Sequence, residues 1–409
     1  MRARAALLAL TLFATATPAR ADVPQFASFD IARQEQDDEN ALDVFLARQP
    51  RAWREDWERS TGGFRSSQGC LTAGQWYLVH ELRTRASMGD SARLEVSLLQ
   101  VHDHESIHES LHLDARFPTR RLGTLGARFR PDFDKSQQDF ALLWDLGGPT
   151  RPHHLQLTFT FEDLFNSLWS FRQSQVGGES RPYVRHPFEP AVRHVWRGAH
   201  HRIESHATWL TPLEQLLLDP SGAIVERSTL WGALAGSRIE LHAGGWAFEA
   251  AVDGKQARSS EHRAGSPLDG RVFRRRWLAE VVLRRDLGET ITAEARWIHQ
   301  ERTQTWRPPA GDGRFEAVDR VPVVEVGWKA HPRAHFRFGA MRGDIDISGA
   351  DTTPVGSYGT RHETRVFIGL QARFGRLVLQ GVEGFELDRE PYEVSFRHDK
   401  GFIQLQTTF

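Results

Sequence analysis

Hydrophobic and polar residues alternate along most of this chain with the period of two that is typical of β-strands. Between His153 and Glu162, Leu155, Leu157, Phe159 and Phe161 alternate with polar residues. Successive side chains of a strand point to opposite faces, so one face of this segment is apolar and the other polar. The same pattern recurs in Gln75–Ala86, His108–Phe117, Gln138–Gly147, Arg202–Trp209, Arg276–Arg284, Ile291–Trp297 and Arg365–Phe374.

Further segments alternate less regularly and are also predicted to be strands. They lie near 91–103, 122–133, 191–199, 223–235, 238–250, 320–329, 334–343 and 377–388. Many are about ten residues long, the length at which a tilted strand crosses a bilayer. The region Ala191–Leu210 reads either as two strands with a turn at 198–201 or as one long strand. Sixteen strands is therefore the predicted number, with eighteen as the alternative.

The connections between the predicted strands alternate between short and long. Working back from the C-terminus, short turns at 374–376, 330–333, 286–289 and 235–237 alternate with long connections at 389–400, 344–362, 302–320 and 251–271. Outer-membrane barrels have short turns on one side of the membrane and longer loops on the other. A soluble β-sandwich has no reason to sort its connections in this way, so the pattern favours a transmembrane antiparallel β-barrel.

The last nine residues, Gly401–Phe409, form a predicted strand that ends the chain on an aromatic side chain. Ile403, Leu405 and Thr407 share a face with Phe409. A terminal strand of this kind resembles the C-terminal signature of bacterial outer-membrane β-barrels, although Thr407 stands where an apolar residue is usual. The resemblance covers Gly74–Phe409 and is to the porin-like class, without a specific family.

The N-terminus has the features of a secretory signal peptide. Arg2 and Arg4 are followed by the apolar stretch Ala5–Ala14, and Ala19–Ala21 matches the cleavage rule. Residues 1–21 are therefore predicted to be removed on export. No later run of about eighteen apolar residues is present, so no transmembrane helix is predicted.

Residues 22–73 do not alternate and are predicted to form a periplasmic or lumen-plugging segment. The acidic run Asp37–Glu39 precedes apolar positions within Ala41–Leu46 that have helical spacing, and acidic residues at its start suit a helix dipole. Trp53 and Trp57 are four residues apart, on one face of a second short helix. The Gly- and Ser-rich stretch 61–69 is predicted to be a linker, which leaves 74–409 for the barrel.

The amino-acid composition agrees with a barrel and bears on which molecules the protein contacts. The mean hydropathy is −0.48, yet the chain holds 13 Trp and 25 Phe. A membrane barrel places such aromatic residues in its interfacial girdles and in its outer apolar belt. The net charge of −1 gives no overall attraction to nucleic acid. The lone Cys70 cannot form an intrachain disulfide. The predicted partners are outer-membrane lipid and the barrel assembly machinery, and the predicted location is the outer membrane.

Nearly all the basic residues are arginines, and many share the polar phase of the strands. The candidate lumen and solute-binding residues are Arg83, Arg85, Arg116, Arg202, Arg276, Arg284, Arg296, Arg365 and Arg373. Carboxylates in the same phase are Glu81, Asp114, Glu162, Glu204, Glu280 and Glu294. Two interpretations remain open. The arginines either brace the wall through ion pairs, or they form a charged ladder that selects anions.

The sequence carries no pattern that points to a cofactor, a metal or a catalytic group. His108 and His112 are four residues apart, which on a strand separates them widely, so no metal site is predicted. There is no C-x-x-C-H motif for haem, and no G-x-S-x-G, H-E-x-x-H or Walker motif. Ser205 and His206 are adjacent and therefore face opposite sides. No cofactor and no enzymatic activity are expected.

The predicted function is a porin-like channel that passes small polar solutes, anions among them. The alternative is a structural sheath, because some barrels of this general class hold a multihaem cytochrome as a conduit across the outer membrane. Neither the solute nor the oligomeric state follows from the sequence.

Overall fold

The fold is known from a computed structural model. It describes residues 60–72, 75–89, 92–102, 107–119, 121–130, 137–147, 151–166, 183–263, 269–307, 313–350, 359–387 and 400–408. The predicted signal peptide, the predicted N-terminal helices and Phe409 lie outside these ranges. Within them, no helix is long and apolar enough to cross a bilayer.

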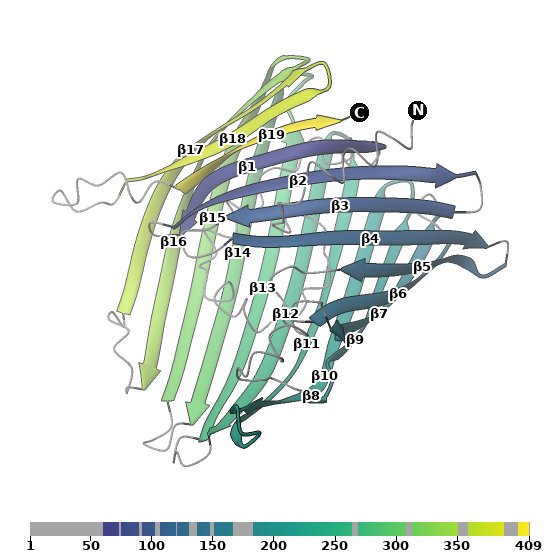
Figure 1. Ribbon diagram of the computed structural model, residues 1–409. Helices are drawn as coiled ribbons and strands as arrows, with labels where there is room; N and C mark the ends of the chain where they lie inside the picture. The colour runs from purple at the N-terminus through teal and green to yellow at the C-terminus, as the bar shows by residue number, and fades with distance from the viewer. Residues whose placement is uncertain are drawn as a thin grey trace.

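The described residues form nineteen strands and the connections between them (Figure 1). The first nine are β1 (Gly62–Thr72), β2 (Gln75–Met88), β3 (Ala92–His102), β4 (Ile107–Thr119), β5 (Gly123–Arg130), β6 (Gln137–Leu146), β7 (His153–Asn166), β8 (Tyr183–Arg185) and β9 (Phe188–Arg197). The others are β10 (His201–Leu218), β11 (Ile224–Ala243), β12 (Trp246–Arg263), β13 (Asp269–Asp286), β14 (Ile291–Arg307), β15 (Gly313–His331), β16 (Ala334–Ala350), β17 (Gly359–Phe374), β18 (Leu377–Glu386) and β19 (Lys400–Thr408).

All the strand pairs are antiparallel, and the sheet closes on itself. β1 pairs with β2 on one side and with β19 on the other, so the first and last strands join. β8 and β9 both pair with β10, β8 near Glu214 and β9 along Arg202–Thr208, so together they fill one position in the wall. The protein is therefore an all-β closed barrel with eighteen strand positions in its wall. Eighteen is the number given above as the alternative to sixteen.

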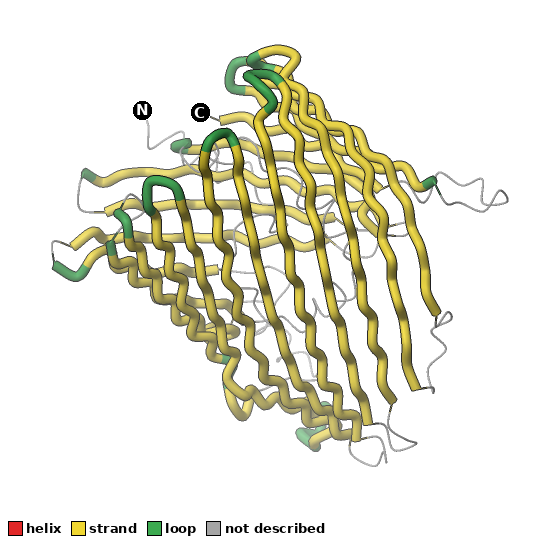
Figure 2. Tube along the Cα trace, turned by 180° about the vertical axis from the view of Figure 1, so that it is seen from behind, coloured by secondary structure: helices red, strands yellow, loops and turns green. Residues whose placement is uncertain are grey.

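The two ends of the barrel differ in their connections, as predicted. At one end, which we call the short-turn rim, β11 turns into β12 through Gly244–Gly245, and β17 turns into β18 through Gly375–Arg376. The glycines of these turns have positive φ, which L-residues with a Cβ rarely adopt. The opposite end, the long-loop rim, joins β16 to β17 and β18 to β19 by longer segments. Several of the green connections in Figure 2 follow the short-turn rim.

The outer face of the wall is apolar and exposed. Leu241, Phe248 and Leu283 lie opposite one another on β11, β12 and β13, and all three are exposed. Val324 on β15 is 60% exposed and Ile403 on β19 is 64% exposed. Gln404 and Gln406, in the other phase of β19, are buried. The predicted phase of the C-terminal strand is thereby confirmed.

Tryptophans mark the two edges of this apolar belt. Trp246 begins β12 at the short-turn rim, and its exposed counterpart Trp277 lies nine residues before the end of β13. Nine strand residues span about 30 Å, or about 23 Å of height at a tilt of about 40°. That height is close to the roughly 25 Å apolar band of outer-membrane barrels.

The predicted linker at 61–69 is wrong, because Gly62–Thr72 forms β1. In β1, Ser, Gly and Gln stand at positions where a membrane strand usually alternates apolar and polar residues. Its strand conformation comes from hydrogen-bonded neighbours on both sides, β2 and β19, and not from its own pattern. The barrel wall therefore begins at Gly62 and not at Gly74.

The predicted turn at 235–237 is also wrong, because β11 runs without interruption from Ile224 to Ala243. Gly236 instead allows close packing inside the barrel. A Cβ on it would lie 2.0 Å from Asp253 Oδ1 and 2.9 Å from the Val252 carbonyl oxygen. Asp253 is paired there with His206, with 3.3 Å between His206 Nε2 and Asp253 Oδ1. Small residues can therefore mark close packing within a strand as well as a turn.

The long connections predicted at 251–271 and 302–320 are largely strand. β12 extends to Arg263, β13 starts at Asp269, and β14 and β15 are separated only by 308–312. These extensions lie beyond the apolar belt, where both faces are polar, so the alternation that identifies a membrane strand is lost. The long wall formed by these strands is seen in Figure 2.

The two faces of β7 allow a direct test of this barrel. Leu157 lies opposite the exposed Val192, whereas Gln156 Nε2 donates a hydrogen bond to Asp145 Oδ1 at 2.7 Å on the inner face. Leu157→Arg should reduce assembly and destabilise the barrel by about 2–4 kcal/mol, because it places a charge in lipid. Gln156→Arg should assemble almost normally, since it adds a partner for Asp145. The measurement is the fraction of folded protein in outer membranes, determined from the difference in gel mobility between unheated and heated samples. Equal yields of the two variants would contradict the assignment of faces.

Candidate functional site on the inner wall

All nine predicted arginines lie on strands in the phase opposite the exposed apolar belt. On β13, for example, Arg284 pairs with Glu294 and then Glu325 across β14 and β15, whereas Leu283 pairs with Ala295 and the exposed Val324. The same registers place the others inside: Arg83, Arg85, Arg116, Arg202, Arg276, Arg296, Arg365 and Arg373. The registers thus place these arginines on the inner phase, and their role in binding solutes stays a prediction.

Many of the inner arginines are ion-paired near the short-turn rim. On the first six strands, Arg116 Nε lies 2.6 Å from Asp114 Oδ1 and also pairs with Asp145. Arg128 Nη2 lies 2.8 Å from Asp114 Oδ2. Arg85 pairs in the same way with Glu95 across β2 and β3. Each carboxylate thus bridges neighbouring strands through charged hydrogen bonds.

The pairing continues through β9, β10, β11 and β12. Glu204 is held by Arg193 at 2.6 Å and by Arg202 at 2.7 Å. Arg238 on β11 lies 3.2 Å from Glu240 and 2.5 Å from Glu249 on β12. Arg202 Nη1 also lies 3.8 Å from Glu240 Oε1 on β11, so these contacts connect four consecutive strands.

On β13 to β16 the ion pairs centre on the enclosed side chain of Arg296. Arg296 Nη2 lies 2.6 Å from Glu294, and Arg296 also pairs with Glu280. Glu294 accepts a second arginine, Arg284, at 2.8 Å. The Arg296 side chain is 8% exposed, whereas that of Arg284 is 49% exposed. Two strands further on, Arg337 Nε donates to Glu325 at 2.6 Å.

Glutamines replace the charges on the last three strands. Gln371 Nε2 donates to Gln380 Oε1 at 3.1 Å, and Gln380 Nε2 donates to Gln404 Oε1 at 2.7 Å. This glutamine ladder, Gln156 on β7 and the ion pairs of the three preceding paragraphs all lie on the inner wall beside the short-turn rim. We call this set of residues the polar ring. Arg65, paired with Glu81, carries the ring across β1. The ring therefore spans the joint between the first and last strands.

A second group of inner cations lies beyond the polar ring, toward the long-loop rim. Arg276 is directly opposite Lys255 on β12 and Arg302 on β14. With Arg274 they line a small cavity of about 30 Å³, and we call these four residues the cationic cluster. Arg302 also lies 3.4 Å from Asp319. Like charges directly opposite on neighbouring strands raise the energy of the wall, and an anion beside them lowers it.

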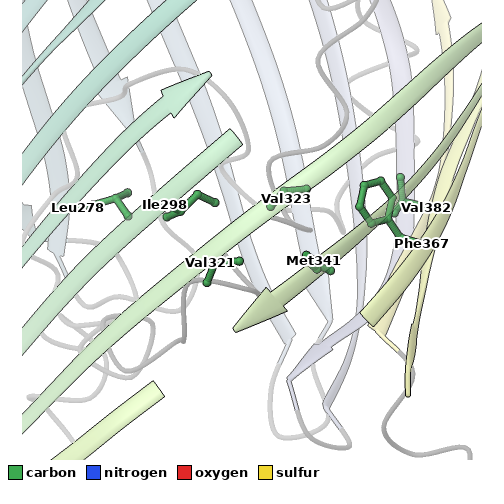
Figure 3. Packing of buried hydrophobic residues seen from close by; sticks show 7 residues of the cluster. All are labelled: Leu278, Ile298, Val321, Val323, Met341, Phe367 and Val382. Atoms are coloured by element: carbon green, nitrogen blue, oxygen red, sulfur yellow. The ribbon is translucent and has the colours of Figure 1, made fainter. Parts of the chain in front are cut away.

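An apolar cluster lies between the polar ring and the cationic cluster on the same wall. It consists of Leu278, Ile298, Val321, Val323, Met341, Phe367 and Val382, one or two from each of β13 to β18 (Figure 3). These side chains are in the inner phase and are at most 7% exposed. Apolar side chains on the inner face of a wide barrel would normally meet water, so their burial is a distinguishing feature of this wall.

The predicted arginines therefore fall into several groups. Arg85, Arg116, Arg202, Arg284 and Arg296 belong to the polar ring. Of the remaining four, Arg83 Nη2 lies 3.4 Å from Ser60 Oγ, Arg365 pairs with Glu363, Arg373 Nε donates to the Gly375 carbonyl at 3.2 Å, and Arg276 joins the cationic cluster.

Sequence reasoning missed most of the cationic cluster. Lys255 and Arg302 lie in stretches that were predicted to be long connections, and only Arg276 was identified. Cross-strand register would have brought them together, but register requires the true strand ends. Of the predicted carboxylates, Glu162 lies on β7, and its side chain is outside the described part. Among the described residues, no group of three or more His, Cys, Asp or Glu is arranged to hold a metal ion.

The fold and the wall define a class. A closed antiparallel barrel with an apolar exterior, tryptophans at the edges of the belt and a polar, ion-paired interior is a transmembrane β-barrel of the bacterial outer membrane.

Solved structures that resemble the chain are outer-membrane proteins. OmpT of Vibrio cholerae, in its outer-membrane expressed form, matches with a TM-score of 0.40 and 10% identity, over 85% of this chain and 97% of that one. OccK5 (OpdH) of Pseudomonas aeruginosa matches with a TM-score of 0.39 and 11% identity, over 86% and 98%. CdiB of Acinetobacter baumannii has a TM-score of 0.43 and 12% identity over 85% of this chain, which spans 60% of the CdiB chain. No protein-family profile and no curated protein sequence matches the chain.

The polar ring predicts a difference between two arginines that share one carboxylate. Arg296→Met should destabilise the barrel by about 3–5 kcal/mol, because it leaves Glu280 and Glu294 enclosed with lost partners. Arg284→Met should cost no more than about 1 kcal/mol, since that arginine is half exposed and Glu294 keeps Arg296. Urea unfolding in lipid vesicles, followed by tryptophan fluorescence, measures both. If Arg284→Met lowered the free energy of unfolding as much as Arg296→Met, burial of the ion pair would not explain the effect.

Proposed function

We propose that the protein is a porin-like channel of the outer membrane that passes small polar solutes and prefers anions. The observation that carries this proposal is the cationic cluster on the inner wall, where Lys255, Arg276 and Arg302 are direct cross-strand neighbours. A barrel of eighteen positions encloses a lumen wide enough for an aqueous path. Charged side chains that line such a path determine which ions pass.

The two groups of inner charges have different roles in this proposal. In the polar ring, arginines and carboxylates alternate, so their fields largely cancel and their main effect is to brace the wall. In the cationic cluster, four cations come together on three adjacent strands, with Asp319 beside Arg302. In this proposal the cluster supplies the positive charge on the inner wall that favours the passage of anions.

The chemistry of the cluster indicates the class of solute. Three of its four members are arginines, whose planar guanidinium groups match the paired oxygens of carboxylate, phosphate or sulfate. Lys255 adds a compact charge that turns toward an anion without a fixed geometry. Small organic acids and inorganic oxyanions fit these donors best.

Ion selectivity in a planar bilayer tests the proposal. The full chain should prefer chloride over potassium in a salt gradient, and Lys255→Gln with Arg276→Gln should lower the anion-to-cation permeability ratio by about twofold or more, because the positive potential falls. The matched control is Arg258→Gln with Arg271→Gln. It removes the same charge from the same two strands, but in the outward phase of the exposed Trp277, and neither arginine lines the cavity of the cationic cluster.

The control should retain the selectivity of the unaltered protein. An equal shift in both variants would mean that the cluster does not set selectivity, and absence of any conductance would contradict the channel. Covalent haem in the protein purified from its own outer membrane, together with absent conductance, would favour the cytochrome sheath instead.

A further inference from the structure

The apolar belt of the outer face is bordered by arginines that lie over tryptophans. On β13 the exposed Trp277 marks the belt edge toward the long-loop rim, and the Arg275 guanidinium lies 5.3 Å from the centre of its ring. At the opposite edge, Arg285 lies over the Trp246 ring at 4.8 Å. This arrangement suits the boundary between acyl chains and headgroups, because the ring contacts the chains while the charge reaches the headgroups.

Two more exposed arginines lie next to Arg275 on the outer face. Arg258 on β12 is directly opposite Phe273 on β13, and Arg271 and Arg275 are two residues before and two residues after Phe273. Diagonal cross-strand neighbours of this kind have Cβ atoms about 7–8 Å apart. Arg258, Arg271 and Arg275 are all exposed, and we call them the outer arginine patch.

Aromatic rings flank the patch, and a hydroxyl lies beside it. Trp231 on β11 and Phe273 on β13 are the direct cross-strand partners of Arg258, so all three share the outward phase. Ser260 lies directly opposite Arg271. Cationic donors and a hydroxyl beside apolar rings form a surface suited to an amphipathic ligand with an anionic head.

The patch has no carboxylate of its own. All the charged residues in the outward phase of 256–260 on β12 and 271–275 on β13 are arginines. Outward arginines on other strands pair with carboxylates: Arg227 with Glu214 at 3.0 Å, Arg320 with Asp346 at 2.8 Å and Arg342 with Asp344 at 3.2 Å. Glu301, diagonal to Arg275 on β14, lies 3.1 Å from His299. An external anion lowers the energy of three like charges in so small an area.

The height of the patch identifies the source of that anion. Arg275 lies two residues and Arg271 six residues beyond Trp277 along β13. At a tilt of about 40° these positions are about 5 Å and 15 Å beyond the edge of the apolar belt, at and just above the headgroup layer. Long loops of outer-membrane barrels face the cell exterior, so this layer belongs to the outer leaflet. The anions that a membrane supplies at this height are headgroup phosphates.

We propose that the outer arginine patch binds the phosphate groups of a phosphorylated lipid in the outer leaflet. Guanidinium groups donate paired hydrogen bonds to phosphate oxygens, and Arg258 with either Arg271 or Arg275 supplies two such groups for one phosphate. The acyl chains of the same lipid lie along the apolar belt beside Trp277. A lipid that binds only the folded barrel also stabilises it.

Thermal unfolding of the full chain in detergent micelles, followed by tryptophan fluorescence, tests the site. The probe is lipid A, a glucosamine-based lipid with two phosphates, which should raise the unfolding midpoint as it is titrated in. Dephosphorylated lipid A should have little effect. Arg258→Gln with Arg271→Gln should weaken the binding of lipid A by about tenfold or more, because two of the three phosphate donors are lost.

The matched control is Arg320→Gln with Arg342→Gln. It removes the same charge from the outer face beyond the belt, but from arginines that already pair with Asp346 and Asp344. This variant should bind lipid A as the unaltered protein does. The difference in gel mobility between unheated and heated samples confirms that each variant is folded before it is titrated.

The lipid site does not depend on the proposed channel. Arg258→Gln with Arg271→Gln should lose lipid binding and keep ion selectivity, whereas Lys255→Gln with Arg276→Gln should do the reverse. The two proposals therefore fail independently.

Four results would overturn the lipid site. The first is equal weakening of lipid A binding in the Arg258/Arg271 variant and in the control. The second is an equal shift with dephosphorylated lipid A. The third is an equal shift with inorganic phosphate alone, which would make the patch a site for free anions. The fourth is a polypeptide that co-purifies with the unaltered barrel and is lost from the Arg258/Arg271 variant, which would give the patch a protein partner.

Discussion

The structure depends on the closure of its sheet. In a bilayer no water is available to the backbone, so every N–H and carbonyl of a spanning strand must pair within the protein. The pairing of β1 with β19 meets this requirement by joining Gly63–Cys70 to Gly401–Thr408. A strand with a weak pattern of its own, such as β1, is held in the wall because its neighbours on both sides need partners. Closure also determines which face of each strand meets lipid and which meets the lumen.

Once the sheet is closed, its two faces follow different energetic rules. The outer face is stabilised by apolar side chains in lipid, and Trp246 and Trp277 mark the extent of that layer. The inner face carries charges, which are costly to enclose unless they are paired. The polar ring meets that condition near the short-turn rim, where arginines pair with carboxylates on most strands and glutamines bond to one another on β17 to β19. The ring therefore acts as the inner brace of the barrel.

Beyond the ring the inner wall is unusual in two respects. It has a buried apolar cluster where a water-filled pore would expose it, and it has like charges opposite one another at Lys255, Arg276 and Arg302. Neither feature strengthens a bare barrel. In the proposed channel, these charges control which solutes pass.

The sequence by itself determined the all-β class, the inner and outer phases and the uneven rims, because a period of two has only two phases and each meets a different solvent. It could not identify β1, the continuity of β11 at Gly236 or the full length of β12 to β15, since these depend on neighbouring strands and on packing. The number of positions, eighteen, was also decided only by pairing. Which arginines brace the wall and which form the cationic cluster depends on cross-strand register, because residues such as Lys255, Arg276 and Arg302 are far apart in sequence and become neighbours only in the closed sheet.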